Sequence, residues 1–272
     1  MKKLKLKSSL VAAVIVFSFS AGHAQFNGLI NRAKNAARSK VDQKVYQATT
    51  LRNVVETVNG MIPEKGDAQG KLECTVGGKD YQLNGKINHQ KWSKTQKSTV
   101  TFTGVPATLE EFEQVRAVLA TEPQGAAVLQ IMAFEMYRRD PALGQQALEL
   151  NNTGTNLRDC IQRLKEMVGD DTGYARPYLA AAMLQGATPE NAYTPKFPYE
   201  MKVRVSPARK YMDSEILGGT VIYLEIDGKG WDTNWRGLEV VRPDGEDYYV
   251  VSNCPAMYTQ CKRIKGAYHG LK

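Results

Sequence analysis

Residues 124–139 read QGAAVLQIMAFEMYRR, and the predicted architecture follows from them. Apolar side chains would face every direction around a helix drawn through it; they are Ala126, Val128, Leu129, Ile131, Met132, Phe134 and Met136. A helix at a protein surface carries its apolar residues on one stripe, so this one should be buried on all sides. The run is also shorter than the roughly 20 apolar residues that span a membrane. The sequence therefore predicts a central helix that the rest of the chain covers.

Four more helices are predicted around this one, within residues 105–186. The run Thr108-Leu109-Glu110-Glu111 has the capping-box pattern, in which Thr and Glu satisfy each other's backbone amides. Another helix begins at Asp140-Pro141, because proline suits the first helical position. Apolar spacing predicts two further helices over 155–168 and Pro177–Gln185. Together these segments form a predicted central five-helix bundle.

Antiparallel strands are predicted on both sides of this bundle. Residues 66–104 form a small antiparallel β unit, in which Gly77-Gly78 is the two-residue turn of a hairpin. Residues 187–265 form a proline-rich connector and a C-terminal antiparallel sheet, packed with the bundle as one domain. Its strands are predicted at 202–205, 220–226, 237–242 and 248–253. Strands, then helices, then strands indicate an α+β class, because α/β folds alternate the two.

Residues 1–24 have the pattern of a cleaved export signal. Four lysines precede the apolar run Leu10–Phe17, and Gly22-His23-Ala24 supplies small residues before a cleavage point. The apolar run is too short for a permanent membrane anchor. The sequence therefore predicts a periplasmic or extracellular protein whose mature chain begins at Gln25 and has no transmembrane segment.

Residues 25–62 are predicted to form a basic N-terminal helical arm. The formal net charge of +8 falls to +4 once the signal is removed, and the remaining excess lies within residues 25–60. The body that follows is neutral, so it offers no broad basic surface and nucleic acid is not a predicted partner. The arm is either a solvated tether or a helix that lies on an anionic membrane surface.

The four cysteines are expected to take part in disulfides, because an even number in an exported chain favours bridges. The pair Cys254 and Cys261 brackets six residues and is the predicted bridge. The pair Cys74 and Cys160 faces inward from a strand and a helix, and these two either bond or stay as buried thiols. No two cysteines have the spacing of a zinc site, so no metal is predicted.

Familiar catalytic signatures are missing from the sequence. It contains no G-x-S-x-G elbow, H-E-x-x-H helix or Walker loop. A Cys254 and His269 nucleophile pair is disfavoured, because a disulfide at Cys254 removes the thiolate. A glycosidase needs only two well-separated carboxylates, and four acidic residues gather near one C-terminal loop: Glu225, Asp227, Asp232 and Glu239. These are either a catalytic group or the solvent face of the sheet.

The loop over residues 227–236 is the predicted binding site. Its aromatic and polar side chains suit a sugar or a peptide; the candidates are Trp231, Trp235, Asp232, Asn234 and Arg236. The alternative is that both tryptophans are buried at the end of the sheet. Calcium at Asp227, Asp232 and Asn234 is disfavoured, because the spacing omits several ligand positions of the usual calcium loop.

The run P-E-N-x-Y-T-P at Pro189–Pro195, with the following strands and closing hairpin, carries a family resemblance. Over roughly residues 100–265 the chain resembles an uncharacterised bacterial family of exported proteins with an unassigned α+β C-terminal domain. The resemblance implies no activity and no catalytic residue.

These observations favour an exported, non-enzymatic binding protein or an envelope-associated protein, with an envelope glycan or protein as its partner and no cofactor. Whether the chain is an enzyme stays open. The alternative is an envelope or secreted hydrolase that acts on a glycan through the carboxylates near Asp227 and Asp232.

Overall fold

The computed structural model describes residues 71–168 and 175–272, so the predicted export signal (1–24) and basic arm (25–62) lie outside the described residues. In the described part the α-helices are α2 (Leu109–Leu119), α3 (Pro123–Arg139), α4 (Pro141–Asn151) and α5 (Gly154–Val168). The strands are β1 (Leu72–Val76), β2 (Lys79–Asn84), β3 (Lys97–Phe102), β4 (Tyr199–Val205), β5 (Met212–Ser214), β6 (Gly219–Asp227), β7 (Trp235–Val241) and β8 (Val250–Asn253). Short 3₁₀ helices are η1 (Ala181–Met183), η2 (Pro189–Asn191) and η3 (Pro255–Tyr258). The α+β class is confirmed.

The strands form one sheet rather than the two separate β regions predicted from the sequence. Its order is β1-β2-β3-β4-β6-β7-β8, and β5 pairs with β6 beside this path. Every pairing is antiparallel. The junction is the β3–β4 pair, where Val100 lies opposite Met201. Pairing across about 100 residues of sequence leaves no local pattern, and for this reason the prediction missed it.

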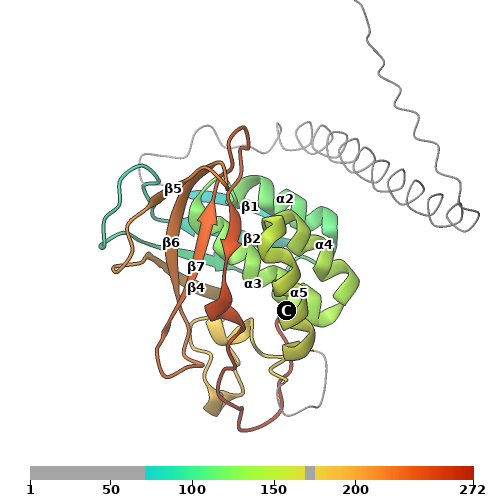
Figure 1. The fold of residues 1–272 in the computed structure, drawn as a ribbon. Helices are drawn as coiled ribbons and strands as arrows, with labels where there is room; N and C mark the ends of the chain where they lie inside the picture. The colour runs from blue at the N-terminus through green and yellow to red at the C-terminus, as the bar shows by residue number, and fades with distance from the viewer. Residues whose placement is uncertain (1–70, 169–174) are drawn as a thin grey trace, which may run out of the picture. The chain divides into compact units, whose positions relative to one another are not determined.

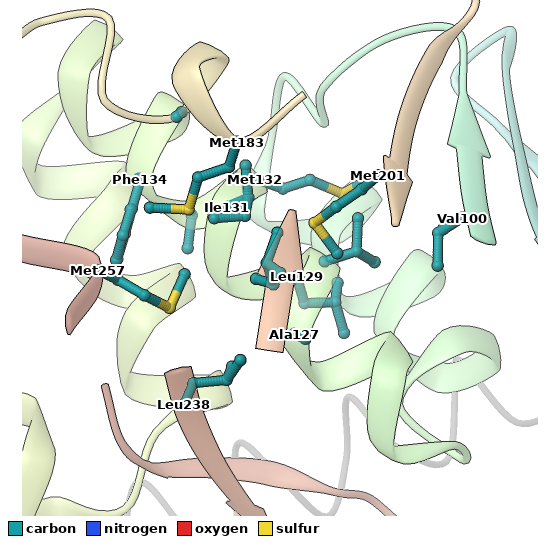
Figure 2. Packing of buried hydrophobic residues seen from close by; sticks show 14 of the residues in the cluster. Val100, Ala127, Leu129, Ile131, Met132, Phe134, Met183, Met201, Leu238 and Met257 are labelled. Carbon is teal, nitrogen blue, oxygen red and sulfur yellow. The ribbon is translucent and has the colours of Figure 1, made fainter. Parts of the chain in front are cut away.

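Helix α3 is the centre of the core, as its all-round apolar pattern predicts. Every residue from Pro123 to Tyr137 is buried, and α3 packs against β3, β4, β6, β7 and β8. Figure 1 shows α3 between the sheet and the other helices. Figure 2 shows side chains from η1, β4 and η3 gathered beside α3: Met183, Met201 and Met257. Burial of such side chains supplies the main favourable free energy of folding.

The helix starts follow the predicted caps, with one difference. Thr108 Oγ1 accepts from the Glu111 amide at 3.1 Å. The Glu111 carboxylate binds the Ala107 amide at 2.7 Å and Lys79 at 2.9 Å, so the box closes one residue earlier than the pattern predicts. At the start of α4, Asp140 Oδ1 accepts from the amides of Ala142 and Leu143. Each cap satisfies amides that a helix start would otherwise leave free.

The predicted five-helix bundle is wrong: the described residues form four α-helices. In place of a fifth helix over Pro177–Gln185 the chain makes turns and the short η1. A segment this short has little helical stability of its own. Its end is held instead by strand-like bonds, because the Gln185 amide donates to the Glu200 carbonyl and the Gln185 carbonyl accepts from the Lys196 amide. Among the described helices, none is long and apolar enough to cross a membrane.

Candidate functional site

A group of polar side chains meets inside the otherwise apolar core, at the junction of α3, α4, α5 and η3. We call it the amide–thiol cluster; its members are Gln130, Asn151, Asn152, Asn156, Cys160, Cys254 and Tyr258. All seven are buried. A buried polar group is costly unless it is hydrogen-bonded. The side chains of the cluster bond to one another and to the nearby backbone, with the exception of Asn151 Oδ1, which has no partner among the described residues.

Gln130 on α3 is the hub of the amide–thiol cluster. Its Oε1 accepts from Nδ2 of Asn151 and from Nδ2 of Asn152, each at 2.9 Å. Its Nε2 lies 3.6 Å from Sγ of Cys160 and 3.6 Å from Sγ of Cys254. One carboxamide offers two donors and two acceptor positions, so Gln130 uses its full capacity. It ties the end of α4 to α5 and to the start of η3.

Cys254 is the most hydrogen-bonded sulfur of the cluster. Besides Gln130, its Sγ accepts from Asn156 Nδ2 at 3.5 Å and lies 3.0 Å from the Tyr258 hydroxyl. Burial raises the pKa of the Cys254 thiol to about 11, although these three partners act to lower it. Burial also raises the pKa of Cys160. Both sulfurs are therefore neutral thiols at pH 7, and neither is a ready nucleophile.

A groove of about 590 Å³ lies directly beside the cluster. We call it the α5–η3 groove; it is lined by Asn156, Asp159, Gln162, Arg163, Asn253, Pro255, Tyr258 and Thr259. Asn156, Asp159 and Gln162 follow one another at intervals of three residues, and Arg163 lies four residues after Asp159, so the α5 members share one face of that helix. Asn156 and Tyr258 belong both to the groove and to the cluster. The buried bonds therefore fix the position of two side chains that a ligand in the groove would meet.

The lining of the α5–η3 groove is polar and close to neutral. Three of its side chains are carboxamides, on Asn156, Gln162 and Asn253, and Asp159 and Arg163 carry opposite charges. A carboxamide can both donate and accept hydrogen bonds, so this lining suits a ligand whose hydroxyl or amide groups can also do both. The volume is within the range of small-ligand sites.

A larger hollow of about 720 Å³ lies at the other end of β6 and β7, between His89, Tyr249 and the turn over 243–247. Its four carboxylates, on Asp213, Asp244, Glu246 and Asp247, are exposed. Burial and the positive charge of Arg242 lower the pKa of His89. The Tyr211 hydroxyl that lines this hollow is buried without a hydrogen-bond partner in the described part of the chain, whereas Asn156 and Tyr258 of the α5–η3 groove are bonded into the amide–thiol cluster. The groove, with its lining fixed by hydrogen bonds, is therefore the stronger candidate.

The side chains of the predicted binding loop over 227–236 fall into two groups, one packed against the protein and one exposed to solvent. Trp231 is buried, and its Nε1 donates to the Thr259 carbonyl at 3.0 Å. Arg236 lies over the Trp231 ring and donates to the Ala256 carbonyl at 2.6 Å and to Thr259 Oγ1 at 2.6 Å. Trp235 is half-buried beneath Arg204, whose guanidinium carbon lies 3.8 Å from the ring centroid. Trp231 and Arg236 thus hold the η3 segment, and they do not line the α5–η3 groove.

The two remaining loop candidates are exposed. Asp232 pairs with Lys262 at 2.8 Å while its side chain stays 92% exposed, and this contact lowers the pKa of Asp232. Asn234 is also exposed. The structure therefore does not bring the five predicted binding residues to one ligand surface.

The four carboxylates of the alternative hydrolase site are each engaged by a different cation. The ion pairs are Glu225–Arg204 at 2.7 Å, Asp227–Lys229 at 2.8 Å, Asp232–Lys262 at 2.8 Å and Glu239–Arg209 at 3.1 Å. None of the four lines the α5–η3 groove. Asp227 also accepts from Gln185, so its oxygens are not free for calcium. Within residues 71–168 and 175–272, no group of three or more His, Cys, Asp or Glu could hold a metal ion.

All four cysteines are free thiols in the structure, so the predicted disulfides are not formed. Cys254 and Cys261 are near in sequence but separated by η3, and each faces different partners. Cys261 lies against Gly230, and its thiol is hydrogen-bonded to Tyr193. Cys74 lies opposite Tyr81 on the β1–β2 pair, whereas Cys160 faces Gln130. Distance along the chain therefore did not predict which cysteines lie near each other in the structure.

The sequence interpretation missed the amide–thiol cluster and the α5–η3 groove. One signal was available: Gln130 lies in a stretch predicted to be buried on all faces, and a buried carboxamide requires partners. The partners themselves come from 21 to 124 residues away. No local pattern marks that convergence.

The described residues thus form an α+β domain in which a buried polar cluster lies directly behind a polar groove. The model of one family, described as Domain of unknown function (DUF6935), matches residues 104–265. The chain therefore belongs to this family, and the amide–thiol cluster and the groove lie wholly inside the matched region. Searches of curated proteins and of solved structures found no match.

Proposed function

We propose that the chain is an exported, non-enzymatic protein that binds a glycan in the α5–η3 groove. The observation that carries this proposal is that Asn156 and Tyr258 belong to both the α5–η3 groove and the amide–thiol cluster. Both line the groove, and both are fixed from behind by hydrogen bonds to Cys254. Fixed polar groups favour binding, because little conformational entropy is lost when a ligand arrives.

A glycan is the ligand class that this lining suits best. Sugar hydroxyls and N-acetyl groups both donate and accept, as do the carboxamides of Gln162 and Asn253. Asn156 adds an acceptor, Oδ1, since its Nδ2 already donates to Asn152 and Cys254. The Tyr258 ring adds an apolar surface, and apolar bodies with a polar tip are common where a ligand has both characters. A strongly charged ligand is less suited, because Asp159 and Arg163 balance each other.

Binding is favoured over hydrolysis by the number of carboxylates at the groove. Most glycosidases place two carboxyl groups about 5 to 9.5 Å apart. Among the described residues that line the groove, Asp159 carries the one carboxylate. The hydrolase alternative would therefore need a second acid from outside this lining.

Titration with a soluble trisaccharide of N-acetylglucosamine, followed by calorimetry, tests the proposal. Gln162→Ala should weaken binding about three- to tenfold, since one hydrogen bond contributes about 0.5 to 1.5 kcal/mol. Gln145→Ala is the matched control, because Gln145 is also an exposed helix glutamine but lies on α4, away from the groove. Equal affinities of the two variants, or no binding by the unaltered protein, would refute the glycan site. Binding of a neutral peptide with the same Gln162 dependence would assign the groove to peptides instead.

Export rests on the signal pattern in residues 1–24. Expression of the full chain in a bacterial host should give a protein outside the cytoplasm whose first residue is Gln25. N-terminal sequencing of the purified protein measures this directly. Recovery in the cytoplasm with residues 1–24 still attached would contradict it. In this proposal the basic arm over 25–62 is a spacer between the envelope and the groove.

A further inference from the structure

Cys160 and Cys254 are the two thiols that the fold brings together. Each sulfur lies 3.6 Å from one and the same nitrogen, Nε2 of Gln130. The Tyr258 hydroxyl also contacts both sulfurs. Their parent segments are neighbours, because α5 packs against both β8 and η3. Of the three ways to pair four cysteines, the structure favours the one that joins these two.

From this juxtaposition we infer that Cys160 and Cys254 form an oxidisable dithiol, which becomes a disulfide on exchange with a small-molecule or protein disulfide. The other two cysteines have no thiol among their partners. Cys261 is hydrogen-bonded to Tyr193 beside Gly230, and Cys74 faces Tyr81. The inference does not require a ligand in the groove, although Cys254 also holds the groove residues Asn156 and Tyr258 from behind.

The exchange is balanced without any further reactant. One protein thiolate attacks a sulfur of the oxidant disulfide, and the first oxidant thiolate leaves. The second protein thiolate then attacks the resulting mixed disulfide at the protein sulfur, and the second oxidant thiolate leaves. The two protons released by Cys160 and Cys254 are taken up by the two departing thiolates. The protein is oxidised by two electrons and the oxidant disulfide is reduced to two thiols.

The folded chain should exchange slowly, because both sulfurs are fully buried. Burial also keeps them protonated at neutral pH, and the thiolate is the attacking form. Oxidation should therefore be faster during folding, or when mild denaturant opens the α5–η3 junction, than in the intact fold.

Disulfide mapping after incubation with oxidised glutathione tests the inference. The full chain is treated at pH 8 with and without mild urea, alkylated under denaturing conditions, digested with trypsin and analysed by mass spectrometry. The expected product is a Cys160–Cys254 bridge, lighter by about 2 Da than the two reduced peptides. Cys74 and Cys261 should carry the alkyl label.

A second protein removes an ambiguity in this assay. Cys254 and Cys261 fall on one tryptic peptide, since no cleavable Lys or Arg lies between them. The double variant Cys74→Ser/Cys261→Ser keeps only the proposed pair and should form the bridge with unchanged yield. Bridges between other pairs, stable glutathione adducts without a bridge, or full alkylation of all four cysteines in urea would each overturn the inference.

Discussion

The 227–236 loop and the amide–thiol cluster make opposite use of polar side chains. In the loop, Trp231 and Arg236 donate to backbone carbonyls of residues 259 and 256. Their hydrogen-bonding groups are therefore already engaged within the protein. In the cluster, side chains bind one another, and Asn156 and Tyr258 also face a groove. The loop has the residue types expected of a binding site, whereas the cluster places polar side chains beside a groove that a ligand could enter. Composition alone therefore does not identify a site, because it does not show where the hydrogen bonds go.

The largest expected effect is on the loop. Trp231→Ala should lower the free energy of unfolding by about 4 kcal/mol, because it removes a buried ring and leaves a cavity. Trp235→Ala, which alters a half-buried ring under Arg204, should cost clearly less. Urea denaturation of both variants measures the difference. An equal loss for the two tryptophans would contradict the assignment of Trp231 to packing.

The next effect concerns the hub of the cluster. Gln130→Ala should lower the free energy of unfolding by about 3 kcal/mol, since it leaves the buried donors of Asn151 and Asn152 without their shared acceptor. Gln145→Ala, at an exposed helix position, should change it by less than about 0.5 kcal/mol. Chemical denaturation gives both values. If Gln130→Ala were as mild as its control, the cluster would not stabilise the fold.

Alkaline pH gives a smaller effect that is specific to the cluster. The pKa of Cys254 is raised to about 11 in the folded chain, so the unfolded chain loses this proton first as the pH rises. Stability is therefore full below about pH 8 and should fall by roughly 2 to 3 kcal/mol towards pH 11 from this thiol alone. Other buried thiols and tyrosines add to the decline. The slope of stability against pH should be smaller in Cys254→Ser, and an unchanged slope would exclude Cys254 as a contributor.

The smallest effect is expected at the exposed end of the loop. Asp232→Asn removes an ion pair with Lys262 that is open to solvent, and such pairs contribute little. The melting temperature and the affinity for the N-acetylglucosamine trisaccharide should both stay unchanged within error. A loss of affinity would return the ligand site to the loop and weaken the case for the α5–η3 groove.

Local patterns predicted the elements of the fold well. The all-round apolar stretch became the buried α3, and Gly77-Gly78 formed the predicted hairpin turn with φ values of 56° and 71°. The sequence interpretation missed β5, whose three residues are too few for an alternating pattern. The sequence interpretation also predicted a helix over Pro177–Gln185, because apolar spacing does not reveal that the backbone of Gln185 bonds to Glu200 and Lys196.

The candidate site was less predictable than the fold. Trp231 and Arg236 were selected by residue type, and their actual role depends on carbonyls of residues 256 and 259. The cysteines were paired by distance along the chain, while the structure brings Cys160 close to Cys254. Both errors have one cause: a hydrogen-bond partner or a thiol neighbour is set by packing between distant segments.

The α+β class, the central position of α3 and the caps that start α2 and α4 could all be predicted from the amino-acid sequence. These depend on periodicity and on contacts within a few residues, which a sequence displays directly. The single sheet, and the gathering of amides and thiols around Gln130 behind a groove, became visible in the folded chain alone. Those features depend on contacts between segments far apart in the chain, and such contacts are chosen by the packing of the whole core rather than by any one stretch.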